Sequence, residues 1–504
     1  MIETTKPNYD VVSLRGIHPI TGIPACAGMT LLFFGLSILL SACAMGPDYK
    51  RPDIETPAQF KEDRGWVQAD PVQFQGAWWT VFGDATLDML EPRVAIANQS
   101  LRASYYTYQQ ALALTDAARA AEFPTVGATV SSTRTSTGTV NAATGTGTTV
   151  SGKTVALTAS WIPDFWGKVQ RQVEANSASA EASGDNLLAA QLSLQGTLAQ
   201  DYFLIRQLDS QTSLAQETVS AYERAMQITQ NRYQAGVATQ ADVALAESQL
   251  ATARVQRATF GVQRAQLEHA IAVLTGDAPS NFSLPPMPGL QEPQAIPAGL
   301  PSQLLLRRPD LRAAERQVAA ANAQIGVSKS AYFPALTLSG QRGWRGPTFS
   351  NLFSAPNIFW SMGPSLAETL FDGGARSAQV AQSQGSYQMA VAQYRQLSLT
   401  ALQQVEDQLV ASVILAEEAA LQKLAVSATD RSLRLTTDQY KAGTVSFLNV
   451  VTAQTAAYTA RNGALLISGQ RFTASVALIQ ALGGGWGTNT RPELGADVMP
   501  QQSN

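Results

Sequence analysis

The chain has 504 residues, of which 45% are hydrophobic and only 14% are charged, well below the roughly 25% charged residues of an average soluble domain. Its formal net charge is -3 and it contains no run of Lys or Arg, so a nucleic-acid-binding surface is excluded. Two His and two Cys in the whole chain rule out a Cys/His zinc site and a framework of several disulfides. We therefore expect no nucleic-acid partner, no metal, no cofactor and no enzymatic activity.

The amino terminus has the pattern of a lipoprotein signal peptide. The apolar run from Leu31 to Leu40 is about half as long as the roughly 20 residues that a membrane-spanning helix needs. It leads into Leu40-Ser41-Ala42-Cys43, which resembles a bacterial lipobox. This pattern predicts removal of residues 1–42 and attachment of diacylglycerol and an N-acyl chain to Cys43.

The residue after Cys43 indicates which of the two bacterial membranes holds the lipid anchor. Ala44 stands where an Asp would retain such a lipoprotein in the inner membrane, so the outer membrane is favoured. Two alternatives remain open: Cys43 merely ends an ordinary cleavage region, or translation begins at Met29. Either start leaves Cys26 outside the mature chain.

Three landmarks occur twice in the same order, each copy between 206 and 210 residues after the first: Tyr233-Gln-Ala-Gly236 and Tyr440-Lys-Ala-Gly443, Phe123-Pro124 and Phe333-Pro334, and Phe165-Trp-Gly167 and Phe371-Asp-Gly373. Preserved order and spacing predict an internal duplication, and a unit of this length is too long for a solenoid repeat. The two halves should therefore be related by a pseudo-twofold axis.

Each half contains two stretches in which apolar and polar residues alternate, the period of a β-strand. Their apolar members are Val126, Ala128 and Val130, then Val155, Leu157, Ala159 and Trp161, then Leu336 and Leu338, and finally Ile358, Trp360 and Met362. We expect β-hairpins at about 124–163 and 334–366. Four strands cannot close a transmembrane barrel, whose smallest form has about eight, so the chain must oligomerise to complete one.

Long stretches without proline follow the hairpins, at 168–235 and 374–441. A continuous helix of this length spans roughly 100 Å. A spacing of eleven residues, typical of a nearly straight supercoil, recurs in Leu402, Val413, Leu424 and Leu435. Left-handed caps are expected at Gly236 and Gly443, followed by second helices over about 239–274 and 446–482.

Short motifs are spread from residue 43 to residue 486. They are Gly46-Pro47-Asp48-Tyr49-Lys50-Arg51-Pro52, Trp78-Trp79-Thr80-Val81-Phe82-Gly83-Asp84, Leu306-Arg307-Arg308-Pro309-Asp310-Leu311-Arg312-Ala313-Ala314-Glu315, Ile325-Gly326-Val327, Phe371-Asp372-Gly373-Gly374 and Leu482-Gly483-Gly484-Gly485-Trp486. This series resembles the lipoprotein branch of the TolC-type outer-membrane factors, the NodT/OprM-like outer-membrane efflux lipoproteins of tripartite RND-type pumps. The stretch from Arg307 to Glu315 is the most specific part of the resemblance.

The resemblance implies a mainly α-helical fold class with a membrane β-barrel part. Each internally duplicated protomer would contribute four strands and long coiled-coil helices, and a homotrimer would form a twelve-strand β-barrel plus a twelve-helix α-barrel. The expected organisation is a signal peptide at 1–42, a lipidated extension at 43–84, a first repeat at 85–290, a second repeat at 291–486 and a tail at 487–504. The protein would be anchored in and span the outer membrane of a Gram-negative bacterium and extend into the periplasm.

The resemblance also implies a function. The chain would passively conduct small molecules to the exterior, served by a periplasmic adaptor (membrane fusion) protein and an inner-membrane transporter of the RND type. Two alternatives stay open: an exit duct for type I polypeptide secretion, and a pore-free structural periplasmic lipoprotein. Trp161 and Trp360 on strands rich in small residues argue against the last, since a periplasmic coiled coil has no use for lipid-facing hairpins.

By the same resemblance, the adaptor docks on the two helical-hairpin tips, at 233–239 and 440–446, with Tyr233, Gly236, Tyr440 and Gly443 as candidate contacts. Packing of the hairpin ends is an equally weighted reading of the two tyrosines. The family's periplasmic constriction is lined by a Leu and, four residues later, an Asp. These positions are Leu448 and Thr452 here, so an acidic ring is in doubt, although Asp242 and Asp438 lie near the tips.

Some motifs have a simpler explanation. Gly147 to Thr154 matches the phosphate-binding pattern G-x-x-x-x-G-K-T, but a strand follows it instead of a helix, which favours a surface loop. His269 lies in a helical stretch without a second His or Cys, so a structural or exposed role is favoured over a metal ligand. Arg307, Arg308 and Asp310 around Pro309 are typical of a helix start with salt bridges.

Overall fold

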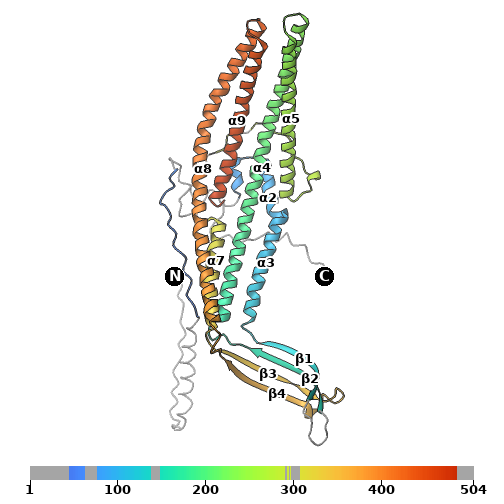
Figure 1. The fold of residues 1–504 in the computed structure, drawn as a ribbon, viewed down its shortest axis with the longest axis vertical. Helices are drawn as coiled ribbons and strands as arrows, with labels where there is room; N and C mark the ends of the chain where they lie inside the picture. The colour runs from blue at the N-terminus through green and yellow to red at the C-terminus, as the bar shows by residue number, and fades with distance from the viewer. Residues whose placement is uncertain are drawn as a thin grey trace, which may run out of the picture.

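The computed structural model describes residues 45–62, 77–137, 148–289, 292–294, 296 and 307–484 (Figure 1). Cys43, the signal peptide and the C-terminal tail predicted from the sequence lie outside these residues. The helices and strands are η1 (Trp78–Phe82), α2 (Ala85–Ala97), α3 (Gln99–Ala120), β1 (Thr125–Thr137), β2 (Thr148–Trp161), α4 (Lys168–Gln234), α5 (Gln240–Leu274), η2 (Pro279–Asn281), α7 (Pro309–Ser330), β3 (Ala335–Gly346), η3 (Ala355–Asn357), β4 (Ile358–Ala367), α8 (Ala375–Lys441) and α9 (Phe447–Ala481).

The helices form a long bundle that has the four-stranded sheet at one end and two helical-hairpin tips at the other (Figure 1). Corresponding elements have equal lengths: α3 and α7 have 22 residues, α4 and α8 have 67, and α5 and α9 have 35. The duplication and the mainly helical fold class predicted from the sequence are confirmed. In the described residues, no helix is both long and apolar enough to cross a membrane.

The largest hydrophobic core lies where α2, α4, α5, α8 and α9 converge in the middle of the bundle. It contains the fully buried side chains of Leu87, Leu198 and Ile205, and Phe203 stacks on Phe472 with ring centroids 4.4 Å apart. Truncation of such a side chain to Ala typically costs about 2–5 kcal/mol. The core therefore fixes both repeats to each other at mid-height.

The sheet is antiparallel, with strand order β1-β2-β3-β4, and it confirms the two predicted hairpins. Its register pairs Ala128 with Leu157, Leu157 with Arg342, and Arg342 with Trp360. Since side chains alternate along a strand, one face gathers the apolar residues, and its part nearer the helices is mostly apolar and exposed. On this face Val126, Leu157, Trp360 and Met362 are 73%, 61%, 73% and 83% exposed. The opposite face carries Thr, Ser and Gln side chains, among them Thr129, Thr158, Ser339 and Gln341.

Candidate functional site

Both hairpin tips have the same backbone geometry. At the first tip (233–239), Gly236 has φ 74° and donates to the Tyr233 carbonyl over 2.9 Å, while the Val237 N–H bonds the Arg232 carbonyl. At the second tip (440–446), Gly443 has φ 78° and donates to the Tyr440 carbonyl over 3.0 Å. Each glycine adopts the left-handed conformation that ends a helix, as the sequence predicts, so both turns are tight and similarly shaped.

The two tip tyrosines have different surroundings. Tyr440 is buried against Phe447, with ring centroids 5.6 Å apart, and the Arg232 guanidinium lies 4.6 Å from its ring. Arg232 also donates to the Tyr440 carbonyl over 3.2 Å, which ties the first tip to the second. Tyr233 is 41% exposed. Tyr440 therefore packs inside the tip, whereas Tyr233 is accessible at its surface.

Leu448 and Thr452 lie one turn apart near the start of α9 and are both exposed. The side chain of Leu448 is 58% exposed, while its neighbours Phe447, Val450 and Val451 are buried in the tip cluster. The Thr452 hydroxyl donates to the Leu448 carbonyl over 3.0 Å. Leu448 therefore presents an apolar side chain outside the packed tip, and Thr452 satisfies its hydroxyl within its own helix.

The two acids near the tips already have partners. Asp242 accepts from the Thr239 N–H over 2.9 Å and from its hydroxyl over 2.8 Å in a capping box at the start of α5. Asp438 pairs with Lys441 at 3.5 Å, and both side chains are largely exposed. Asp438 is therefore paired with a cation, whereas Asp242 serves as a helix cap.

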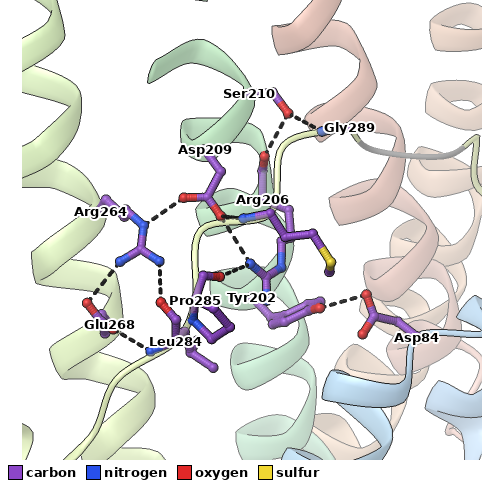
Figure 2. A network of polar contacts seen from close by, with 11 residues as sticks. Asp84, Tyr202, Arg206, Asp209, Ser210, Arg264, Glu268, Leu284, Pro285 and Gly289 are labelled. Carbon is purple, nitrogen blue, oxygen red and sulfur yellow. Dashed lines mark hydrogen bonds and ion pairs between the residues drawn. The ribbon is translucent and has the colours of Figure 1, made fainter. Parts of the chain in front are cut away.

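A buried polar network binds α4 to α5 at mid-height (Figure 2). Asp209, which is 1% exposed at its side chain, accepts from Arg206 over 3.0 Å and from Arg264 over 2.6 Å. Arg264 also pairs with Glu268 at 3.0 Å. Such charges are tolerated in a core only when each is paired and hydrogen-bonded.

The same network holds the chain segment after α5. The carbonyls of Leu284 and Pro285 accept from Arg264 and Arg206 over 2.6 and 2.9 Å, and the Gly289 N–H donates to the Ser210 hydroxyl over 3.0 Å (Figure 2). Arg206 also lies 4.7 Å from the ring of Tyr202. These hydrogen bonds hold residues 284–289 against both α4 and α5.

Sequence reasoning missed this network. Arg206 and Asp209 stand three residues apart, and Arg264 and Glu268 four apart, which are ordinary spacings for surface ion pairs on a helix. The available signal was the position of Asp209 directly after Leu208 in a helix whose apolar residues Leu198 and Leu208 are buried, where an unpaired acid would not be tolerated.

The Arg-Arg-Pro-Asp stretch forms the start of α7, as predicted. Pro309 occupies the first turn, and Arg308 pairs with Asp310 at 2.6 Å. Arg308 further donates to the Gln404 side chain over 2.7 Å and to the Ala481 carbonyl over 3.2 Å, which joins α7 to α8 and α9. Its role is structural.

The first described residues hold the amino terminus against the sheet end of the bundle. The Met45 N–H donates to the Trp166 carbonyl over 3.3 Å, and Arg171 donates to the Met45 carbonyl over 3.2 Å. Gly46, with φ 109°, lies so close to Gly326 that a Cβ at Gly46 would be 2.6 Å from the Gly326 Cα. The chain therefore passes this point with no room for a side chain, and Met45 is fixed two residues after Cys43.

His269 and the phosphate-binding pattern were the other candidate binding residues in the sequence. His269 is exposed on α5, and Lys153 and Thr154 lie within β2. Across the described part of the chain, no group of three His, Cys, Asp or Glu side chains is placed to hold a metal ion.

A protomer with an apolar exposed sheet at one end, hairpin tips at the other and roughly 100 Å helices between them is of the class of elongated outer-membrane channel proteins. The chain matches the family described as Outer membrane efflux protein over residues 92–277 and 300–484, and it belongs to that family.

Named relatives and solved structures agree. The chain is 29% identical over 455 residues to the probable efflux pump outer membrane protein TtgC of Pseudomonas putida, covering 89% of this chain and 94% of TtgC. It is 28% identical over 463 residues to the cation efflux system protein CusC of Escherichia coli, covering 90% and 99%. The structure of the outer-membrane channel OprN superposes with a TM-score of 0.81 at 28% identity, covering 88% of this chain and all of OprN. The chain is thus an outer-membrane channel component of an efflux pump.

Proposed function

We propose that this chain acts as a homotrimeric, passive exit duct of a tripartite pump, for small molecules or ions. The observation that carries the proposal is a pair of unpartnered apolar stripes on opposite edges of the protomer. On α8 the stripe consists of Leu399, Val410, Ile414, Leu421, Leu424 and Leu435, each between 38% and 68% exposed. These residues recur at helical spacing and so lie on one side of the helix.

The second stripe lies on α5. Val255, Val262 and Val273 are 66%, 59% and 62% exposed, and their spacings of seven and eleven residues also place them on one side. Figure 1 shows α8 and α5 at opposite edges of the bundle. Two different apolar edges favour a head-to-tail contact between copies, which closes into a ring when the rotation fits.

The sheet supports the same assembly. Its exposed apolar face suits lipid, whereas β1 and β4 are edge strands whose free backbone groups cannot face lipid unpaired. Pairing of β4 of one copy with β1 of the next in a trimer would give a twelve-strand barrel. No enzymatic step is part of this proposal.

The amino terminus fits a lipid anchor on Cys43. Met45 is held by Trp166 and Arg171 at the sheet end of the bundle, which is the end that the proposed barrel places in the membrane. Acyl chains bind bilayers by about 0.8 kcal/mol per buried methylene, so several chains together anchor stably. The diacylglycerol and N-acyl chain are the only added groups proposed.

The tips are the proposed docking surface for the periplasmic adaptor, with the inner-membrane transporter, of the RND type, as the source of energy. Tyr233, Gly236 and Gly443 are exposed at the far end of the bundle. Burial of Tyr440 places this residue beneath the surface, where it sets the shape of both tips. Because TtgC and CusC are named as efflux proteins, export of small molecules or ions is favoured over polypeptide secretion.

The proposed periplasmic closure is a ring of Leu448 side chains, one from each copy. An apolar neck of this kind can exclude water and ions without any charge. Replacement of Leu448 by Ala should raise single-channel conductance about twofold or more in planar bilayers and sensitise cells to large antibiotics. The matched control is Thr452→Ala, one turn away, which should leave both unchanged. An open channel in Thr452→Ala together with a closed one in Leu448→Ala would show that the constriction is not at Leu448.

A further inference from the structure

The exposed apolar face of the sheet contains a groove of about 600 Å³ that the proposed duct does not explain. Leu157 and Val126 line one side, and Trp360 and Met362 the other. Gly340 lies between them, and a Cβ built on it would meet nothing closer than the Met362 Cγ at 3.8 Å. The groove is therefore open above Gly340 and wide enough for an aliphatic chain.

A cation stands within this apolar face. Arg342 lines the groove and is exposed, and it pairs across the sheet with Leu157 and Trp360. It forms no ion pair or hydrogen bond with the described residues. A guanidinium on a lipid-facing surface is costly unless a polar or anionic group reaches it, so its presence needs a partner outside the chain.

Charge on the sheet has a single sign. The four strands carry Arg134, Lys153, Arg342 and Arg345, and they contain no Asp or Glu. Strand alternation places Arg134, Lys153 and Arg342 on the apolar face and Arg345 on the opposite face. Lys153 lies beyond Val155 at the end away from the helices, where its amino group donates to the Ser132 hydroxyl and lies 5.1 Å from the ring of Phe349.

We infer that this groove binds one anionic lipid of the outer membrane, with an acyl chain over Gly340 and a phosphate-bearing headgroup on Arg342 and Lys153. The apolar walls suit the chain, and Arg342, which lines the groove and has no acidic partner in the described residues, suits the phosphate. Lys153 lies four residues further along the same face, beyond Val155, and adds a second cation on the side away from the helices. Trp360 beside Arg342 fits the boundary between hydrocarbon and headgroup, where Trp side chains concentrate. The inference rests on the proposed barrel, which makes this face the outer one.

Native mass spectrometry of the full-length protein tests the site. The purified protein is incubated with equal amounts of phosphatidylglycerol and phosphatidylcholine in mixed micelles, and the retained lipids are counted on the assembled species. We expect the wild type to retain phosphatidylglycerol at least fivefold over phosphatidylcholine and Arg342→Gln to lose this preference. Gly340→Leu, which fills the groove, should lower retention of both lipids.

The matched control is Arg345→Gln, three residues away on the same strand but on the opposite face, where Arg345 lies 4.6 Å from the ring of Phe359. It removes the same charge and should keep the preference. Equal retention of the two lipids by the wild type, or equal losses in Arg345→Gln and Arg342→Gln, would overturn the inference. If the proposed trimeric duct does not form, the same mass spectrum will show single protomers, so this outcome is distinguished from a loss of lipid binding.

Discussion

The two long helices of the duplicated chain have the same length and opposite exposure. Of the 67 residues in α4, 28 are buried within the protomer, whereas only eight of the 67 residues in α8 are buried. The two repeats thus kept the same helix length after duplication, but their long helices now pack against different surroundings. Helix α4 is the internal core of one chain, and α8 keeps an exposed apolar stripe, which is typical of a surface that contacts another chain.

The ion pairs of the two repeats differ in burial in the same way. Asp209 of α4 lies between Arg206 and Arg264 with 1% of its side chain exposed. The ion pair between α8 and α9, Asp430 with Arg461 at 2.8 Å, is 23% and 40% exposed. Removing one partner of a buried pair leaves an uncompensated charge, while an exposed pair contributes little. The comparison therefore predicts unequal effects for matched mutations.

The largest effect is expected for Asp209→Ala. Arg206 and Arg264 would lose their shared carboxylate inside the core, which should lower the free energy of unfolding by about 3–5 kcal/mol. Asp430→Ala is the control and should cost less than about 1 kcal/mol. Urea unfolding of the detergent-solubilised protein, followed by circular dichroism, measures both values. Equal losses would mean that the first repeat is not the internal core.

At the tips the comparison is reversed, because Tyr440 at the end of α8 is buried and Tyr233 at the end of α4 is exposed. Tyr440→Ala removes an aromatic ring held by Arg232 and Phe447 and should cost about 3 kcal/mol. Tyr233→Ala should change stability by less than about 0.5 kcal/mol. Thermal unfolding compares the two variants. If the adaptor docks as proposed, Tyr233→Ala should still weaken adaptor binding, and an unstable Tyr233→Ala would contradict the assignment.

A smaller, pH-dependent effect is expected at Glu91 of α2, which packs in the core beside α4. This side chain is fully buried, neither carboxylate oxygen has a hydrogen-bond partner in the described residues, and burial raises its pKa to about 9. Since the folded state holds the proton more tightly than the unfolded chain, stability falls as pH rises from about 4.5 towards 9.

Glu91→Gln removes this dependence because the amide carries no charge. It should raise the free energy of unfolding by about 1–3 kcal/mol at pH 8 and by little at pH 4. The difference between the variant and the wild type is measured by urea titration at the two pH values. A difference that is larger at pH 4 than at pH 8 would show that Glu91 is ionised in the folded protein.

The sequence predicted the elements well and the contacts poorly. The ends of the long helices were predicted from Gly236 and Gly443, and their length from the absence of proline. The strands were predicted from strict alternation around Val126 and Trp360. All of these are local signals. The network around Asp209 was missed because its partner Arg264 is 55 residues away and two of its acceptors are backbone carbonyls of the segment after α5.

The two tip tyrosines show the same limit. They occupy identical positions in repeated motifs, so the sequence could not tell which of them is buried and which is exposed. Burial of Tyr440 depends on Arg232, which comes from the other repeat and lies 208 residues away in the chain. Contacts of this kind are set by tertiary packing alone.

The central claim is that other copies of the chain cover α8. Thiol labelling of Leu424→Cys and of Val237→Cys tests it directly, because in a single protomer Leu424 and Val237 are almost equally exposed, at 68% and 65%. In the assembled protein, we expect the thiol at position 424 to react at least tenfold more slowly than the one at position 237 at the tip, and the two rates to converge after denaturation. Equal rates in the native protein would contradict it.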